Sequence, residues 1–187
     1  FDIAGEERKV ISYETNIDYK GYDFITPLFN AIVNKRVLKV TYEPFGKPSF
    51  EVIFHPYYLK QYNNRWFVLG YNQELEIDAW NMPLDRIVEV EEIEGNYRQN
   101  EIDWEDWFSD MIGVTRSKED KPLEIKLQFS PAISPYVQTK PLHQTQKSRQ
   151  LEDGSLEVRI NVIPNKEIKS LLLSFGDQVK VLNPNTF

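Results

Sequence analysis

Hydrophobic and polar positions repeat with two different periods along the first half of the chain. Over residues 23–35 apolar side chains recur every three or four positions, which predicts a helix packed on a core. Thr26 is expected to cap this helix, with Pro27 at its first position. Two neighbouring stripes are expected to face inward, formed by Phe24, Leu28 and Ile32 and by Ile25, Phe29 and Val33.

From Leu38 onward the apolar period changes to two, which is typical of strands. Asn63 and Asn64 stand between two such segments, and asparagine tolerates the positive φ that a type I′ turn demands. A hairpin is therefore expected there, with a new strand opening at Arg65. Short connections favour a mostly antiparallel sheet that is small enough to curl into a barrel. The expected strands are residues 38–42, 50–62 with a bend at His55-Pro56, 65–71, 75–82 and 87–93.

The middle of the chain predicts a second helix and then a linker. Asp103 can cap a helix over residues 101–113, and Gly113 would end it. One face of this helix is aromatic and apolar, formed by Trp104, Trp107, Phe108 and Met111. Serine, lysine and proline over residues 117–122 indicate a boundary between two domains.

The last third alternates strands and helices. Strands are expected over residues 123–129, 156–162 and 179–182, with a short helix over 131–137. A further helix is expected to begin after Asn165 as its cap and to end before Gly176, with Ile168, Leu171, Leu172 and Phe175 facing inward. This order predicts a small α+β unit of ferredoxin-like type.

Composition narrows the possible chemistry. The chain has no cysteine, which excludes disulfides, thiolate metal sites and cysteine nucleophiles. It has no apolar run near the roughly 18 residues that a membrane helix needs, so a soluble, cytoplasmic protein without membrane contact is expected. The formal net charge is −7, and residues 85–110 hold ten acids against two arginines. The remaining 19 acids and 20 bases leave room for a basic site elsewhere.

Signals for catalysis are missing from the sequence. The two histidines, His55 and His143, lie 88 positions apart, and no phosphate-loop, dinucleotide or nucleophile-elbow motif occurs. We therefore expect a protein that is not an enzyme and that holds no metal or cofactor.

A polar and aromatic group on neighbouring predicted strands is the main candidate site. Aromatic rings stack on bases and guanidinium groups pair with phosphate, so this composition suits an anionic ligand that contains bases. The alternative is structural, because the rings can fill a core and Arg86 can pair with Asp85. The candidate ligand-binding residues are His55, Tyr57, Tyr58, Arg65, Trp66, Trp80 and Arg86.

Two runs of sequence, FHPYYLKQYNNRWFVLGYN and WNMPLDRIVEVEEI, resemble the WYL-domain family of bacterial transcriptional regulators. The helix segment FITPLFNAIVNKRVLKVTY precedes them in the family's order, and PYVQTKPLHQTQK and LLLSFGDQVKVLNP are similar to the family's C-terminal extension. Two departures stand out. Trp66-Phe67-Val68 replaces the Trp-Tyr-Leu triplet, and Trp80 stands about where the family often has an arginine.

The resemblance implies an Sm-like β-barrel preceded by a helix, which serves as a ligand-sensing module. Family members are thought to bind nucleotide or single-stranded oligonucleotide effectors, and commonly bind double-stranded DNA through an N-terminal helix-turn-helix, which this sequence lacks. A homodimer is expected, through the C-terminal unit or residues 104–111, because palindromic sites require two-fold symmetry. The alternative is a purely structural dimerisation module without ligand binding.

The expected domain organisation has four parts. Residues 1–21 would be a lead-in from a missing N-terminal segment, and residues 22–98 the Sm-like barrel. Residues 99–121 would be an acidic helix and linker, and residues 122–187 the C-terminal α+β extension.

Overall fold

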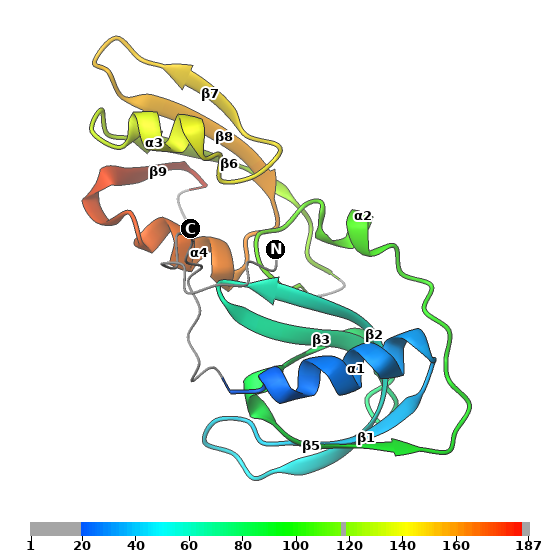
Figure 1. The fold of residues 1–187 in the computed structure, drawn as a ribbon. Helices are drawn as coiled ribbons and strands as arrows, with labels where there is room; N and C mark the ends of the chain where they lie inside the picture. The colour runs from blue at the N-terminus through cyan, green and yellow to red at the C-terminus, as the bar shows by residue number, and fades with distance from the viewer. Residues whose placement is uncertain (1–19, 117–118, 185–187) are drawn as a thin grey trace, which may run out of the picture.

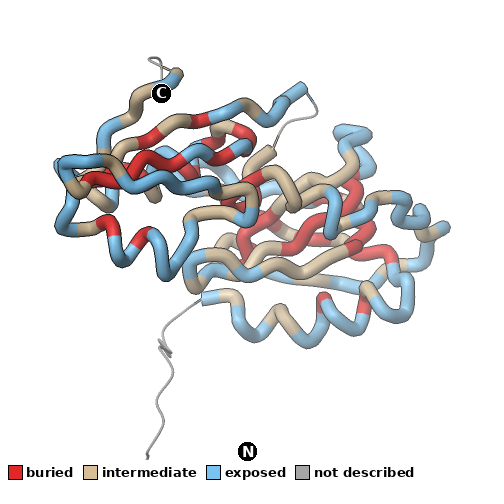
Figure 2. The backbone as a smooth tube through the Cα atoms, turned by 90° about the horizontal axis from the view of Figure 1, so that it is seen from above, coloured by how far each residue is buried: buried red, intermediate tan, exposed pale blue. Residues whose placement is uncertain are grey.

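The computed structural model describes residues 20–116 and 119–184. Within these residues the chain forms two antiparallel sheets, each with helices of its own (Figure 1). The buried residues lie along the middle of each sheet and form two separate cores (Figure 2). The α+β class is confirmed. Of the predicted lead-in over residues 1–21, residues 1–19 lie outside the described part of the chain.

The first helix, α1 (Ile25–Val33), follows a short 3-10 turn, η1 (Tyr22–Phe24). The 3-10 turn leads directly into α1, so Thr26 lies inside the helix and the predicted cap is wrong. Pro27 is tolerated because the first-turn N–H groups have no acceptor within the helix. The second predicted inward stripe is wrong at Phe29 and Val33, which are 56% and 61% exposed, whereas Ile25 packs against the core.

The N-terminal sheet has five strands in the order β4-β3-β2-β1-β5. Every described pairing is antiparallel, and none joins β4 to β5, so the sheet stays open and the expected closed barrel does not form among these residues. Pro56 is accommodated where the β2–β3 register shifts, as at a bulge. The strands are β1 (Val37–Tyr42), β2 (Phe50–Tyr62), β3 (Arg65–Asn72), β4 (Ile77–Pro83) and β5 (Ile87–Ile93).

The hairpin between β2 and β3 confirms the asparagine-turn prediction. Asn63 and Asn64 have φ angles of 47° and 58°, and Tyr62 pairs with Arg65 across the turn. Positive φ at both central residues gives the backbone twist that a tight antiparallel hairpin needs. Arg65 therefore opens β3 at the end of the sheet next to the turn.

The core of the N-terminal sheet lies between α1 and the strands. Leu28 and Ala31 of α1 are buried against a group of apolar strand residues. Trp66 and Trp80 are partly buried against the same core. The fully or almost fully buried strand residues include Val40, Val52, Phe54, Val68 and Met82.

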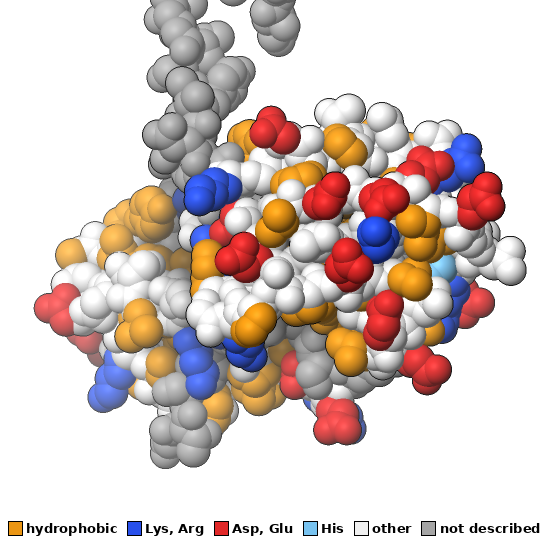
Figure 3. All heavy atoms as spheres, turned by 90° about the horizontal axis from the view of Figure 1, so that it is seen from below, with side chains coloured by type: hydrophobic (Ala, Val, Ile, Leu, Met, Phe, Trp, Pro, Cys, Tyr) orange, Lys and Arg blue, Asp and Glu red, His pale blue; other side chains and the backbone are white. Residues whose placement is uncertain are grey.

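The acidic side chains of strand β5 lie on the surface. Its carboxylates Glu89, Glu91 and Glu92 are exposed, and Lys39 and Arg36 form ion pairs with Glu91 and Glu92 at 2.5 and 3.3 Å. Figure 3 shows acidic side chains spread over the face of the molecule seen from below. Exposed ion pairs of this kind contribute little to folding stability, so the acidic side chains of β5 mainly form a solvated surface.

The second predicted helix is shorter than the sequence suggests. Helix α2 (Trp104–Phe108) begins after Asp103, whose carboxylate accepts hydrogen bonds from the backbone of Glu105 and Asp106, so the predicted cap is confirmed. The helix ends at Phe108 rather than at Gly113. Residues 109–116, called the linker segment below, continue without regular structure, and its residues 111–114 are buried.

The C-terminal unit has the element order β-α-β-β-α-β and the strand order β7-β8-β6-β9. Asn165 caps α4 by accepting a hydrogen bond from Ile168 N at 3.0 Å, as predicted. Both helices pack on one face of the sheet, while the edge strand β7 was not predicted. The elements are β6 (Leu123–Phe129), α3 (Ser134–Thr139), β7 (Lys147–Gln150), β8 (Leu156–Val162), α4 (Lys166–Leu173), the 3-10 turn η3 (Gly176–Gln178) and β9 (Val179–Asn183).

Helices in this fold are short. The longest in the described ranges, α1, has nine residues, and no helix in those ranges is long and apolar enough to cross a membrane.

Candidate ligand-binding cleft

A cleft of about 930 Å³ lies between the N-terminal sheet and helix α4. One wall comes from the β2–β3 hairpin, from Tyr42 and from the residues around η2 (Leu84–Arg86). The other wall comes from the linker segment and from one side of α4. Its size falls within the range of pockets that hold small ligands in proteins. Both units of the chain therefore contribute to one concave surface.

Positive charge prevails in the cleft, although the whole chain carries −7. Two carboxylates line it, Asp85 and Glu167, together with four cations, Lys20, Arg65, Arg86 and Lys166. The formal charge of the lining is therefore +2. A concave surface with one prevailing sign of charge attracts ligands of the opposite sign.

Arg65 reaches the cleft because the asparagine hairpin places it at the start of β3. Its Nη2 lies 3.4 Å from Asp85 Oδ2, and its side chain remains 48% exposed. The sequence suggested that Arg86 would pair with Asp85, but Arg65 is the partner in this ion pair. The second carboxylate oxygen of Asp85, Oδ1, is buried and has no hydrogen-bond partner.

Arg86 lies deeper in the same wall. Its guanidinium carbon is 4.3 Å from the ring centroid of Phe45, and its Nε is buried without a hydrogen-bond partner. Phe45 is 69% exposed, so one ring face is available to solvent or to a ligand. Burial raises the pKa of the Tyr42 hydroxyl, and the nearby Arg86 guanidinium opposes this rise.

Glu167 contributes the acidic group of the opposite wall. It lies in the first turn of α4, is 8% exposed, and its Oε1 accepts a hydrogen bond from Thr115 Oγ1 at 2.5 Å. Its Oε2 is buried without a partner. Residues on the cleft thus hold three buried polar atoms with unused hydrogen-bonding capacity, on Asp85, Arg86 and Glu167. Such atoms are uncommon in folded proteins, and their concentration at one place favours a site that binds a polar ligand.

The structure brings together three of the seven residues that the sequence singled out. Arg65, Trp66 and Arg86 all line the cleft. Trp80 does not, because its ring packs edge-on against Phe54 and Tyr42 with ring centroids 6.1 and 6.2 Å apart.

His55 is engaged within the chain. It is 2% exposed, its Nδ1 accepts a hydrogen bond from Arg98 N at 3.0 Å, and its Nε2 lies 3.1 Å from Gln73 Oε1. Because Nδ1 accepts, the proton is assigned to Nε2, which donates to the amide oxygen. This histidine fastens the segment after β5 to the sheet, and neither nitrogen is free for a ligand.

Tyr57 and Tyr58 also lie outside the cleft lining. Tyr57 is 6% exposed, and burial raises the pKa of its hydroxyl. Tyr58 stacks on Trp104 of α2, with ring centroids 5.2 Å apart and an angle of 16° between the rings. These two side chains hold the connection after β5 and helix α2 against the sheet.

Several cleft residues escaped the sequence reasoning. Tyr42 and Asn81 belong to the same sheet as Arg65, and Phe45 lies in the loop between β1 and β2, but none stands within a recognisable motif. Lys166 and Glu167 follow the Asn165 cap directly, and that cap was the available signal for a charged first turn of α4. Nothing in the sequence indicated that this turn faces the N-terminal sheet.

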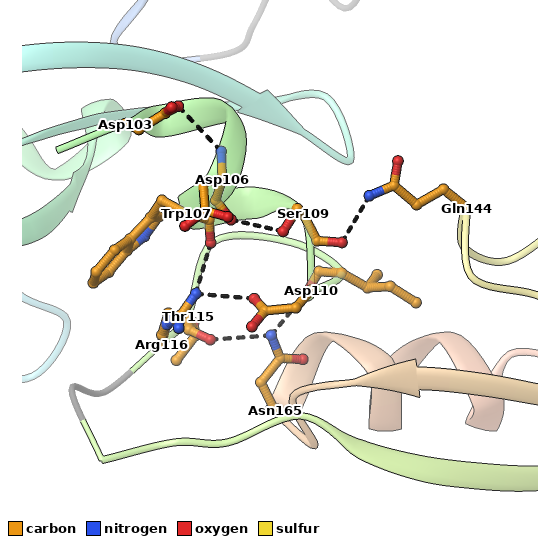
Figure 4. Close-up of polar contacts among 10 residues, drawn as sticks. Asp103, Asp106, Trp107, Ser109, Asp110, Thr115, Arg116, Gln144 and Asn165 are labelled. Atoms are coloured by element: carbon orange, nitrogen blue, oxygen red, sulfur yellow. Dashed lines mark hydrogen bonds and ion pairs between the residues drawn. The ribbon is translucent and has the colours of Figure 1, made fainter.

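The linker segment is bonded to both units. Asn81 of β4 donates to Val114 O at 2.7 Å, and Asn165 donates to Ile112 O and Thr115 O at 2.8 and 3.0 Å. Figure 4 shows Asn165 beside Thr115 in this network, next to the Arg116–Asp110 pair. Val114 and Thr115 also line the cleft. The linker segment therefore contacts the cleft and is hydrogen-bonded to both units of the chain.

Within residues 20–116 and 119–184, no group of three or more histidine, aspartate or glutamate side chains is arranged so that it could hold a metal ion.

Comparison with known proteins identifies both parts of the chain. The family model of the WYL domain matches residues 23–92, and that of the WCX domain matches residues 121–187. Among solved structures, proteasome accessory factor B/C (PafBC) of Arthrobacter aurescens resembles this chain at 16% identity with a TM-score of 0.40. The match covers 91% of this chain and 26% of that one. No curated protein matches the sequence. With a WYL domain followed by a WCX domain, the chain belongs to the WYL-domain family.

Proposed function

We propose that the chain is the ligand-sensing regulatory region of a bacterial transcriptional regulator. It binds a nucleotide or oligonucleotide effector in the cleft and controls a helix-turn-helix that binds double-stranded DNA and lies outside this sequence. The observation that carries the proposal is the cationic cleft, which has walls from both the WYL and the WCX domain.

The lining chemistry suits phosphate and base together. Arg65 can exchange its exposed ion pair with Asp85 for a charge-assisted bond to phosphate, and Lys166 approaches from the opposite wall. Phe45 offers an exposed ring for stacking, and the partly buried Trp66 adds a second aromatic surface. Asp85 and Glu167 can accept hydrogen bonds from base amino groups or sugar hydroxyls.

The position of the cleft supports a sensor. A ligand that contacts the hairpin and α4 at once favours one relative arrangement of the WYL and WCX domains. Ligand binding can shift an equilibrium only when the ligand prefers one of its states, and a two-domain site provides that preference.

Calorimetric titration of the 187-residue chain tests the proposal. The panel contains mononucleotides, cyclic dinucleotides and single-stranded DNA and RNA hexamers. Arg65→Gln should weaken binding by about 10- to 100-fold, because one charge-assisted hydrogen bond contributes roughly 1.5–3 kcal/mol. Arg36→Gln is the matched control, since it removes the same charge from an exposed pair with Glu92 outside the cleft.

Two results would contradict the proposal. The first is no binding of any panel member at millimolar concentration. The second is equal weakening by the Arg65 and Arg36 variants, which would mean that only the overall charge matters. Affinity should also fall as salt rises, because phosphate neutralisation releases counterions.

A structural dimerisation module remains the second candidate. The observation that favours it is the engagement of His55, Tyr57, Tyr58 and Trp80 in packing rather than in an open site. The calorimetric titration, together with sedimentation equilibrium of the chain with and without each panel member, separates the two functions. The module predicts a homodimer that no ligand changes, and the sensor predicts ligand binding in the cleft.

The finer assignments belong to the same proposal. The β-α-β-β-α-β order and the strand order β7-β8-β6-β9 support a ferredoxin-like WCX domain. A helix followed by a five-stranded antiparallel sheet supports an Sm-like WYL domain, although that sheet is open. The regulator would act in the cytoplasm, as a homodimer, without catalysis and without a cofactor.

A further inference from the structure

The C-terminal sheet has one face without helices. Alternate residues of β6 and β8, including Ile125, Leu127, Val158 and Ile160, are buried under α3 and α4. The residues between them point to the other face, because side chains alternate along a strand. That open face carries five cations, Lys126, Lys147, Arg149, Arg159 and Lys180.

Register aligns these cations in rows across the strands. Arg159 of β8 pairs with Lys126 on one side and with Lys147 on the other, which gives a row of three cations on three adjacent strands. In the next row Arg149 pairs with Glu157, and Lys180 pairs with Gln128. Adjacent strands lie about 4.8 Å apart, so the first row spans roughly 10 Å.

Glu157 stands at the centre of this open face. Its carboxylate lies 2.8 Å from Lys126 Nζ, 3.2 Å from Arg159 Nη2 and 3.5 Å from Arg149 Nη2. These contacts, above all the hydrogen bond from Lys126, lower the pKa of Glu157. One carboxylate thus holds three cations in place, and this group keeps a formal charge of +2.

The charge of this region contrasts with the rest of the chain. Residues 121–187 contain nine Lys and Arg against six Asp and Glu, a net charge of +3. Residues 20–116 contain ten against sixteen, a net charge of −6. The open face carries only Glu124 and Glu157 as acids, so the cationic character of the WCX domain is concentrated there.

We propose that the open face of the WCX sheet binds the phosphate backbone of double-stranded nucleic acid without reading its sequence. The charge complementarity is direct, because rows of cations on a flat sheet face a polyanion. None of the outward positions of β6, β7 and β8 holds an aromatic ring, whereas single strands are bound by stacking on such rings. The surface is separate from the cleft and shares with the proposed function only the presence of DNA.

The test compares two variants of the whole chain that lose the same charge. K147Q/R149Q/K180Q removes cations from the open face and leaves Lys126 and Arg159 to hold Glu157. R36Q/K47Q/K140Q removes three exposed cations elsewhere. Fluorescence anisotropy with a 20-base-pair duplex of random sequence is recorded from 25 to 200 mM salt, after circular dichroism has shown both variants to be folded.

We expect the wild type and the R36Q/K47Q/K140Q control to bind with similar slopes of log affinity against log salt. The open-face variant should lose at least tenfold in affinity at the lowest salt. Its slope should become shallower by about 0.9 for each phosphate contact removed, or up to about 2.7 for three.

Other outcomes overturn the proposal. No duplex binding by the wild type at 25 mM salt, or equal losses in the two variants, would reject a built surface. Tighter binding to a polyglutamate peptide than to the duplex would assign the face to an acidic protein. A salt-sensitive dimer in sedimentation that only the open-face variant loses, without duplex binding, would assign it to a second copy of the chain. The cleft titration with Arg65→Gln is independent of all four results.

Discussion

Asn165 is the residue whose replacement should affect the described structure most sharply. It is 7% exposed and makes three hydrogen bonds with two different consequences. Its Oδ1 caps α4 through Ile168 N, and its Nδ2 holds the linker segment through Ile112 O and Thr115 O. Removal of the side chain therefore affects a helix end and a contact between two segments at once.

The expected loss follows from these contacts. An N-cap side chain contributes about 1 kcal/mol, with a range of roughly 0.5–2. Each of the two bonds to carbonyl groups of the linker segment contributes roughly 0.5–1.5 kcal/mol. Because the three bonds share one side chain, their effects do not simply add. We expect Asn165→Ala to lower the free energy of unfolding by about 2–4 kcal/mol.

Urea unfolding, followed by tryptophan fluorescence and by circular dichroism, measures this loss. All four tryptophans lie before residue 110, so fluorescence follows the WYL domain and α2, while circular dichroism follows the whole fold. Asn161→Ala is a matched control on the exposed face of β8 and should change stability by less than about 0.5 kcal/mol. Asn165→Asp keeps the capping oxygen but loses both donors and should stay well below the wild type.

A change of less than about 0.5 kcal/mol for Asn165→Ala would refute the reasoning, because it would mean that water or a shifted backbone replaces all three bonds. Wild-type stability of Asn165→Asp would also refute it, since that result would leave the linker contacts without energetic weight.

Three further predictions concern other parts of the fold. Leu28→Ala should cost about 2–5 kcal/mol in urea unfolding, whereas Phe29→Ala on the exposed side of α1 should cost far less; equal losses would contradict the observed helix face. Gly113→Ala should destabilise the chain in the same assay, because Gly113 has a φ of 90° and an added Cβ would lie 2.4 Å from Glu167 Cγ; unchanged stability would show that this contact relaxes. The pKa of Glu157 in the folded state lies below its ordinary 4.5, so its contribution to folding stability is present above pH 4.5 and is lost as the pH falls through the folded-state pKa. Glu157→Gln should therefore be less stable than the wild type at pH 7, and the difference should shrink on acidification. A difference in stability that stays constant with pH would contradict the ion network.

Local signals in the sequence predicted local structure well. Asn63-Asn64, Asp103 and Asn165 each satisfy or position neighbouring backbone groups, so their roles are readable from a few residues. The failures are also physical. The exposure of Phe29 depends on which side of α1 meets the sheet, and β7 has the polar sequence KSRQ without any alternation. An edge strand with exposed side chains needs no apolar period, so the periodicity could not indicate it.

The candidate site was only partly readable for a different reason. Arg65 and Trp66 could be placed from the hairpin, because a turn fixes which residues start the next strand. Trp80 and Tyr58 are, like Trp66, aromatic residues on neighbouring predicted strands. In the folded chain, however, Trp80 packs in a core and Tyr58 stacks on Trp104. Aromatic residues suit both uses, and sequence alone does not distinguish them.

The linker segment gives the cleft its connection to the rest of the molecule. Val114 and Thr115 line the cleft, and their carbonyl groups accept hydrogen bonds from Asn81 of the WYL domain and Asn165 of the WCX domain. The proposed effector, by engaging Thr115 or Glu167, would act on the contacts between the linker segment and the WCX domain, next to the Asn81–Val114 bond to the WYL domain. Because a buried carbonyl that loses its donor costs about 1–3 kcal/mol, a small displacement of the linker segment carries an energy comparable with ordinary allosteric coupling. For the sensing function proposed above, the hydrogen bonds that Asn81 and Asn165 donate to backbone carbonyls of the linker segment are therefore the contacts through which an effector in the cleft would act on the domain arrangement.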